Sequence, residues 1–350
     1  MNLAIRLRAQ HSGPAARVLY SVTTVCVAML GTSFSLQAEE PASSGSRFRT
    51  ENKQVAPPAS EEDSAEMNSE ELEVALEKRV RTLKRGTSQR SARKTGLAAL
   101  PLTQMTEQNR AKAEHVLSSL SLFRELPTLS VEVNPEIYRF FVQNPDVAVS
   151  IWRVMQISDF KMWQTNQNEY EADAGDGTIG IIDVLLRSET DNVIYCEGEY
   201  KSPLLKNPIK GQTVLHLQTK FSKGVSGEDI ATHRLYMYVS FPSQSVETVA
   251  RVMSPVSNAI VDRNFKEISL FLNMMTLAMT RQPGWVHAVS TRMEGVIDIR
   301  KTQLLRLTEL LSQEYQKQQL AGPEGNRLSD NSPVPQKPTF IQTSGRPLSN

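Results

Sequence analysis

Two glutamates separated by one residue are the clearest candidates for chemistry in this sequence. Glu197 and Glu199 lie in the stretch NVIYCEGEYK, whose alternation predicts a β-strand. Because successive strand side chains point to opposite faces, the two carboxylates share one face and lie about 7 Å apart. That separation fits some pairs of glycosidase carboxylates. It also fits the solvent side of a sheet, which we favour because Ile194 and Cys196 make the other face apolar.

In the opposite orientation of the sheet, the two carboxylates line an internal cavity together with possible proton donors and acceptors. The candidate partners are His216, Tyr236 and Tyr238, with Lys201 and Lys220 beside them. A buried carboxylate has a raised pKa and can transfer protons. The alternative function is therefore a hydrolase or cyclase that uses one glutamate as its acid–base group.

Other common catalytic and metal-binding patterns are absent from the sequence. The histidines show no HxH or HExxH spacing. No nucleophile elbow, P-loop or GxGxxG motif is present. The acidic stretch at residues 173–177 lacks the spacing of a calcium loop and is typical of a hairpin turn. We therefore expect no metal and no cofactor, and a binding protein is favoured over an enzyme.

The N-terminal residues have the layout of a secretory signal. Arg6, Arg8 and Arg17 precede an apolar run at residues 18–30, and small and polar residues lead to Ala38. This order predicts a signal peptide over residues 1–38 and export to the periplasm or the exterior. The apolar run is shorter than the roughly 20 residues of a membrane span, so no span is expected after cleavage.

Charge argues against nucleic acid as a partner. The formal net charge of the whole chain is +1, and cleavage of the signal removes three arginines without removing any acidic residue. The remaining chain has no basic excess that would attract a phosphate backbone.

Composition divides the rest of the chain into three parts. Residues 39–105 are predicted to form a disordered, charged linker with a helix at about 69–85. Residues 106–314 are predicted to form a single globular domain, and residues 315–350 a disordered tail. The linker helix has acids in its first half and bases in its second, so it is either a partner-binding helix or a solvated linker.

The predicted domain begins with helices and continues with strands. Asn134-Pro135-Glu136 and Asn144-Pro145-Asp146 each predict the start of a short helix. From about residue 158 to residue 241, alternating segments separated by turn residues predict consecutive antiparallel strands. A long helix with a broad apolar stripe follows, and an amphipathic helix begins after Pro283-Gly284.

These elements predict an α+β fold in which an antiparallel sheet of about five strands packs on a long C-terminal helix. The order of elements resembles the helix-grip arrangement of START-like and Bet v 1-like proteins. That resemblance implies a curved sheet around the helix, with a cavity between them. We expect an apolar ligand site there, although the same residues also suit an ordinary core. The predicted lining residues are Phe271, Met275 and Met279 from the helix, and Leu215, Leu217 and Met237 from the strands.

A second resemblance involves several longer segments, namely FFVQNPDVAVSIWRVM, GDGTIG, CEGEY, VLHLQ and DRNFKEISLFLN. They resemble a family of exported planctomycete proteins of unknown function. The resemblance covers about residues 137–290 and implies export, but it implies no catalytic residues.

The sequence therefore predicts an exported, non-enzymatic domain that binds a small apolar or lipid-like ligand between the sheet and the long helix. The alternatives are an enzyme that uses a carboxylate in the same cavity, and a periplasmic scaffold that binds a protein partner through the helix at 69–85.

Overall fold

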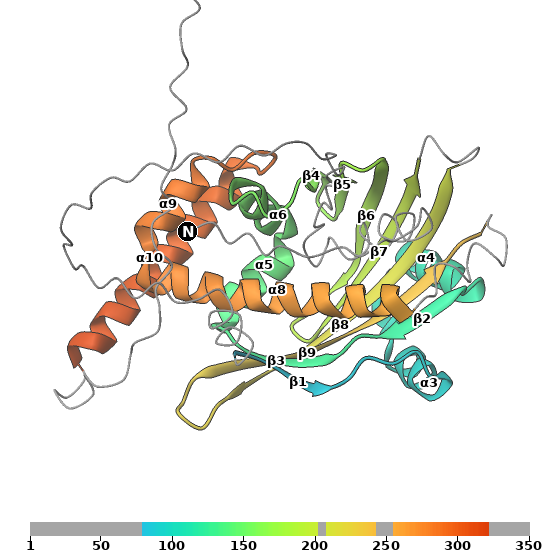
Figure 1. Ribbon diagram of the computed structural model, residues 1–350, viewed down its shortest axis with the longest axis horizontal. Coiled ribbons are helices and arrows are strands. Elements are labelled where there is room, and N and C mark those ends of the chain that lie inside the picture. Colours follow the sequence, from blue (N-terminus) through green and yellow to red (C-terminus); the bar gives the residue numbers. More distant parts are fainter. Residues whose placement is uncertain (1–78, 202–207, 243–254, 322–350) are drawn as a thin grey trace, which may run out of the picture.

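The computed structural model describes residues 79–201, 208–242 and 255–321 (Figure 1). The predicted signal peptide lies outside the described residues, as do most of the predicted linker and the chain beyond residue 321.

One large antiparallel sheet is the centre of the described fold, and it contains nine strands. The strands are β1 (Val80–Lys84), β2 (Leu122–Glu125), β3 (Thr128–Glu132), β4 (Lys161–Asn166), β5 (Glu169–Asp173), β6 (Thr178–Arg187), β7 (Asp191–Tyr200), β8 (Ile209–Lys223) and β9 (Asp229–Ser240). Their order across the sheet is β1-β3-β9-β8-β7-β6-β5-β4, and β2 pairs with the part of β9 that β3 leaves free. Strands β4 to β9 form the predicted meander.

Helices cover both faces of this sheet. They are α3 (Arg90–Ala99), α4 (Glu107–Ser118), α5 (Pro135–Gln143), α6 (Pro145–Val154), α8 (Pro255–Arg281), α9 (Pro283–Ser290) and α10 (Asp298–Ala321), with a short 3₁₀ turn, η1, at Leu102–Gln104. Figure 1 shows α8 crossing one face of the sheet, with α9 and α10 beyond its C-terminal end. Helices α3 and α4 pack on the opposite face.

The α+β class is correct, but the predicted sheet of about five strands is too small. Strands β1, β2 and β3 were missed because each is only four or five residues long, although Thr128–Glu132 does alternate polar and apolar residues. All four residues of β2 are buried, including Arg124 and Glu125. The helix-grip arrangement is also wrong, because α8 is followed by two more helices and the sheet is covered on both sides.

The predicted domain boundaries need correction at both ends. Residues 80–84, expected at the end of the charged linker helix, form the strand β1, which pairs with β3. Residues 90–99, expected in the linker, form α3. At the other end α10 continues to Ala321, beyond the predicted boundary at residue 314. Four of the five residues of β1 are exposed, so its charged sequence is that of an edge strand.

The two sheet faces have separate hydrophobic cores. The first core, between the sheet and α5, α6, α8, α9 and α10, contains Cys196, and Ile194 packs against it. The second core, beneath α3 and α4, contains Val193 and Tyr195 from the same strand. This alternation along β7 places Ile194 and Cys196 toward α8, as the sequence predicted.

Local signals explain the helices that line the first core. The side-chain oxygen of Asn134 accepts hydrogen bonds from the backbone N–H groups of Glu136 and Ile137, at 2.8 and 3.3 Å, and so caps α5. Asn144 ends α5, and Pro145 then begins α6 in its first helical position. The two helices meet at this corner and present their apolar faces to α8.

Candidate functional site

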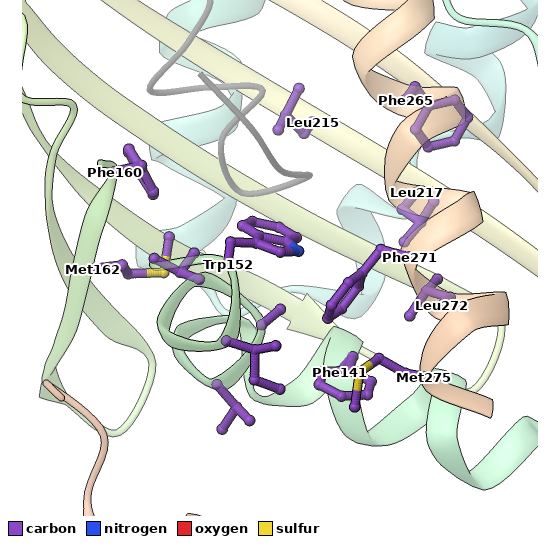
Figure 2. Packing of buried hydrophobic residues seen from close by; sticks show 14 of the residues in the cluster. Phe141, Trp152, Phe160, Met162, Leu215, Leu217, Phe265, Phe271, Leu272 and Met275 are labelled. Carbon is purple, nitrogen blue, oxygen red and sulfur yellow. The ribbon is translucent and has the colours of Figure 1, made fainter. Parts of the chain in front are cut away.

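A cavity of about 60 Å³ lies between the first face of the sheet and helices α5, α6 and α8. Its walls are largely aromatic. Phe271 of α8 packs against Phe141 of α5 and Trp152 of α6, with ring centroids 5.3 and 5.2 Å apart. Figure 2 shows Trp152 and Phe271 pointing toward each other, with Phe141 close to Phe271. The sheet contributes Val184, Ile194, Leu217 and other residues from β6 to β9.

A chain of buried hydrogen bonds reaches the cavity from the sheet. Nδ1 of His233 lies 2.9 Å from the hydroxyl of Tyr138, which also bonds Thr219. Nε2 of His233 lies 2.8 Å from the hydroxyl of Ser269, and that hydroxyl donates to the carbonyl of Phe265. Since the serine proton is used there, Nε2 donates and Nδ1 accepts the Tyr138 proton.

Burial determines the protonation of His233 and Tyr138 in this hydrogen-bonded network. Burial lowers the pKa of His233 to about 4, so the ring is neutral at neutral pH. Burial also raises the pKa of the Tyr138 hydroxyl well above its usual range, although the bond from Thr219 opposes that shift. Tyr138 and His233 line the cavity, but their polar atoms are already occupied, which suits a structural role better than proton transfer.

One end of the cavity is polar. Arg187 of β6 and Asn192 of β7 are directly opposite each other in the sheet register, and both line the cavity. The side chain of Arg187 is exposed, so the cavity reaches the surface at this end. Arg187 donates to the hydroxyl of Tyr170 at 3.3 Å. No carboxylate is among the residues that line the cavity.

The six predicted ligand-binding residues divide into two groups. Phe271 and Leu217 line the cavity. Met275, Met279, Leu215 and Met237 are buried in the first core but are not among the lining residues. They fill the space between helix and sheet, so most of the apolar stripe of α8 serves packing.

The candidate catalytic glutamates lie on the opposite face of the sheet from this cavity. Glu197 is exposed and accepts a hydrogen bond from Tyr195 at 2.8 Å. Glu199 pairs with Lys201 at 2.5 Å, and this bond holds the pKa of Glu199 below its usual range. The alternative in which these two carboxylates line the cavity is therefore incorrect. Side chains alternate between the two faces along β7, so Glu197 and Glu199 point to the same face as Val193 and Tyr195, which α3 and α4 cover.

His216, Tyr236 and Tyr238 lie on the same face of the sheet as the two glutamates, but in its buried part. Nε2 of His216 is 2.7 Å from Oδ1 of Asp191. Burial lowers the pKa of His216, although Asp191 opposes that shift. The ring packs against Tyr236, with centroids 5.9 Å apart, and is fully buried. A histidine enclosed in this way does not contact a substrate.

Helix α3 encloses the two tyrosines. Gly96 allows this close approach, because a Cβ atom at that position would lie 2.6 Å from the Tyr238 hydroxyl. The hydroxyls of Tyr236 and Tyr238 are buried and have no hydrogen-bond partner among the described residues. They form part of the second core rather than a site open to ligands.

Two residues of the polar end, Arg187 and Asn192, were missed by reasoning from sequence. Both flank the turn between β6 and β7, where exposed polar residues are ordinary. Only the strand pairing, together with α5 and α6 packed nearby, shows that they border an aromatic cavity.

The described residues offer neither a metal site nor a membrane-spanning helix. They contain no group of three or more acidic, histidine or cysteine side chains arranged to hold a metal ion. Among the helices in the described ranges, none has the length and apolar character needed to cross a bilayer. The chain matches no protein-family model and no curated protein.

Proposed function

We propose that this domain binds the apolar part of a small ligand between β6–β9 and helices α5, α6 and α8, without catalysing a reaction on it. The observation that carries the proposal is the aromatic-walled cavity itself, which reaches the surface at Arg187. Concave apolar sites with a few polar groups are the usual form of small-molecule sites. The N-terminal sequence pattern supports export, so we propose that binding occurs outside the cytoplasm.

The size of the cavity limits the ligand. An engineered apolar cavity of about 150 Å³ in another protein binds benzene, and the present cavity is about 60 Å³. It holds only a few carbon atoms unless side chains move. A ligand with a short chain or a small ring fits this volume better than a complete lipid, and the rest of the ligand extends toward Arg187.

The residues around the cavity support binding without catalysis. Its titratable side chains are Tyr138, Arg187 and His233. Tyr138 and His233 bond each other, and the remaining nitrogen of His233 bonds Ser269. An arginine is a poor acid–base group because its guanidinium stays protonated in proteins.

Binding of hexanol to the full-length chain tests the proposal. The chain contains three tryptophans, and among them Trp152 lines the cavity. In an NMR titration, the indole N–H resonance of Trp152 is expected to shift in a saturable way. The resonances of Trp163 and Trp285 serve as internal references because neither residue lines the cavity.

A cavity-filling variant identifies the site. Ala148 is 6% exposed and lines the cavity from α6, so Ala148→Phe is expected to abolish hexanol binding. Ala98→Phe, on the exposed surface of α3, is the matched control and should bind normally. If Ala148→Phe unfolds the chain, Ile268→Phe at a half-buried lining position replaces it. Hexanol binding that survives in a folded cavity-filling variant would overturn the proposal.

A further inference from the structure

The polar end of the cavity contains a positive charge that is not neutralised. Arg187 and Arg300 both donate to the hydroxyl of Tyr170, at 3.3 and 3.2 Å. Arg300 is buried and forms an ion pair with Asp146 at 2.6 Å. Arg187 forms no ion pair with any carboxylate of the described residues. Both guanidinium groups bond the same phenol oxygen, but Asp146 pairs with Arg300. The charge of Arg187 therefore remains available at the mouth of the cavity.

The shared phenol also positions Arg187. Tyr170 is fully buried and is itself held by Arg300, whose guanidinium lies over its ring with 5.5 Å between Cζ and the ring centroid. The bond to this fixed oxygen restrains an otherwise exposed guanidinium beside the cavity. Its other N–H groups point to no described acceptor, and a guanidinium has five such donors.

Asn192 provides a second polar group at the same place. The residue is 7% exposed, but its amide atoms are not among the buried side-chain atoms that lack a hydrogen-bond partner. Its carboxamide is therefore accessible at the cavity and can bond a ligand that replaces solvent there. Its direct pairing with Arg187 across β6 and β7 places both groups at one end of the aromatic walls.

We propose that the ligand is an amphipathic monoanion whose carboxylate is bound by Arg187 and Asn192 while its apolar group enters the cavity. One uncompensated charge matches one negative charge. A guanidinium binds a carboxylate through two parallel hydrogen bonds, and the Asn192 amide can donate a third. This inference rests on the proposed function and adds the chemical class of the ligand.

Hexanoate and hexanol, which share the same chain length, separate this inference from the proposed function. Both are titrated into the full-length chain at pH 7 and low salt, with the Trp152 resonance as the signal. We expect hexanoate to bind at least about tenfold more tightly than hexanol, because its carboxylate accepts charge-assisted hydrogen bonds from Arg187 and the alcohol does not. The difference should diminish as salt is added, because Arg187 is exposed.

Variants at the polar end provide the decisive comparison. Arg187→Gln is expected to weaken hexanoate binding about tenfold or more and to weaken hexanol binding much less, since the alcohol carries no charge for Arg187 to pair with. Asn192→Leu should act in the same direction with a smaller effect. Arg93→Gln removes the same charge from the exposed surface of α3, on the other side of the sheet, and should change neither affinity.

The outcomes are distinct. Equal affinities for hexanol and hexanoate in the unaltered chain would overturn the monoanion assignment and leave the proposed function intact. Equal loss of both ligands in Arg187→Gln would also overturn it, because the arginine would then act by shaping the cavity. Failure of both ligands to bind the unaltered chain would overturn the proposed function and this inference together.

Discussion

At the scale of single residues, His233 joins the sheet to two helices. Its two ring nitrogens bond Tyr138 of α5 and Ser269 of α8, and the ring packs on Phe265 with centroids 4.9 Å apart. Every polar side-chain atom of this hydrogen-bonded network has a partner, so the network is a stable part of an otherwise apolar core. Protonation of His233 would place a proton on Nδ1, which accepts the hydrogen bond from Tyr138, and would bury an unpaired charge.

The low pKa of His233 predicts loss of stability in weak acid. The pKa falls from 6.5 to about 4 on folding, so between these values the unfolded chain binds more protons than the folded chain. The contribution to the free energy of unfolding is complete above pH 6.5 and decreases by about 3 kcal/mol as pH falls to 4. Urea unfolding at pH 7 and at pH 4.5 measures this change.

Two variants show whether His233 causes it. His233→Gln lowers stability at pH 7 but should make the difference between the two pH values smaller than in the unaltered chain. His115→Gln, on the exposed side of α4, should retain the original difference. A pH dependence unchanged in His233→Gln would contradict the assignment.

At the scale of elements, the helix start predicted from Asn134-Pro135-Glu136 is the observed start of α5, and Asn134 forms the predicted cap. Asn134→Ala removes the oxygen that accepts from two backbone N–H groups. It is expected to lower the free energy of unfolding by about 1 kcal/mol. Asn134→Ser, which retains a capping oxygen, should recover most of the loss. Equal losses for both variants, measured by chemical unfolding, would mean that the cap contributes little.

At the scale of the whole molecule, the sheet joins two cores into one structure. The strands β6 to β9 contribute residues to both cores. Neither core can therefore unfold without disrupting the hydrogen bonds between these shared strands. Lys112 of α4 pairs with Asp183 of β6, and Asn109 donates to the carbonyl of Leu185 at 2.9 Å, which fixes the second helical layer to the same strands.

This arrangement predicts one shared unfolding transition. Leu185→Ala in the second core and Leu304→Ala in the first core should each cost about 2–5 kcal/mol. Both variants should shift the loss of tryptophan fluorescence and the loss of far-ultraviolet dichroism together. A variant that separates these two signals into different transitions would show that the cores unfold independently.

The sequence alone predicted the elements that depend on neighbouring residues. The Asn-Pro pairs mark the starts of α5 and α6, and alternation defines β6 to β9. Gly175 and Gly177 both have positive φ angles in the turn between β5 and β6, where the GDGTIG segment predicts a hairpin. These signals require only a few adjacent residues. They were sufficient for the α+β class and for the orientation of Ile194 and Cys196.

Only the tertiary structure decided the size of the sheet and the composition of the candidate site. Strand β2 is buried on both faces and pairs with β9 more than a hundred residues later, so no local pattern reveals it. The β6–β7 register places Arg187 opposite Asn192, and the packing of α5, α6 and α8 on the sheet encloses the cavity that these two residues border. Burial and pairing are properties of distant contacts, and a linear pattern of residue types does not contain them.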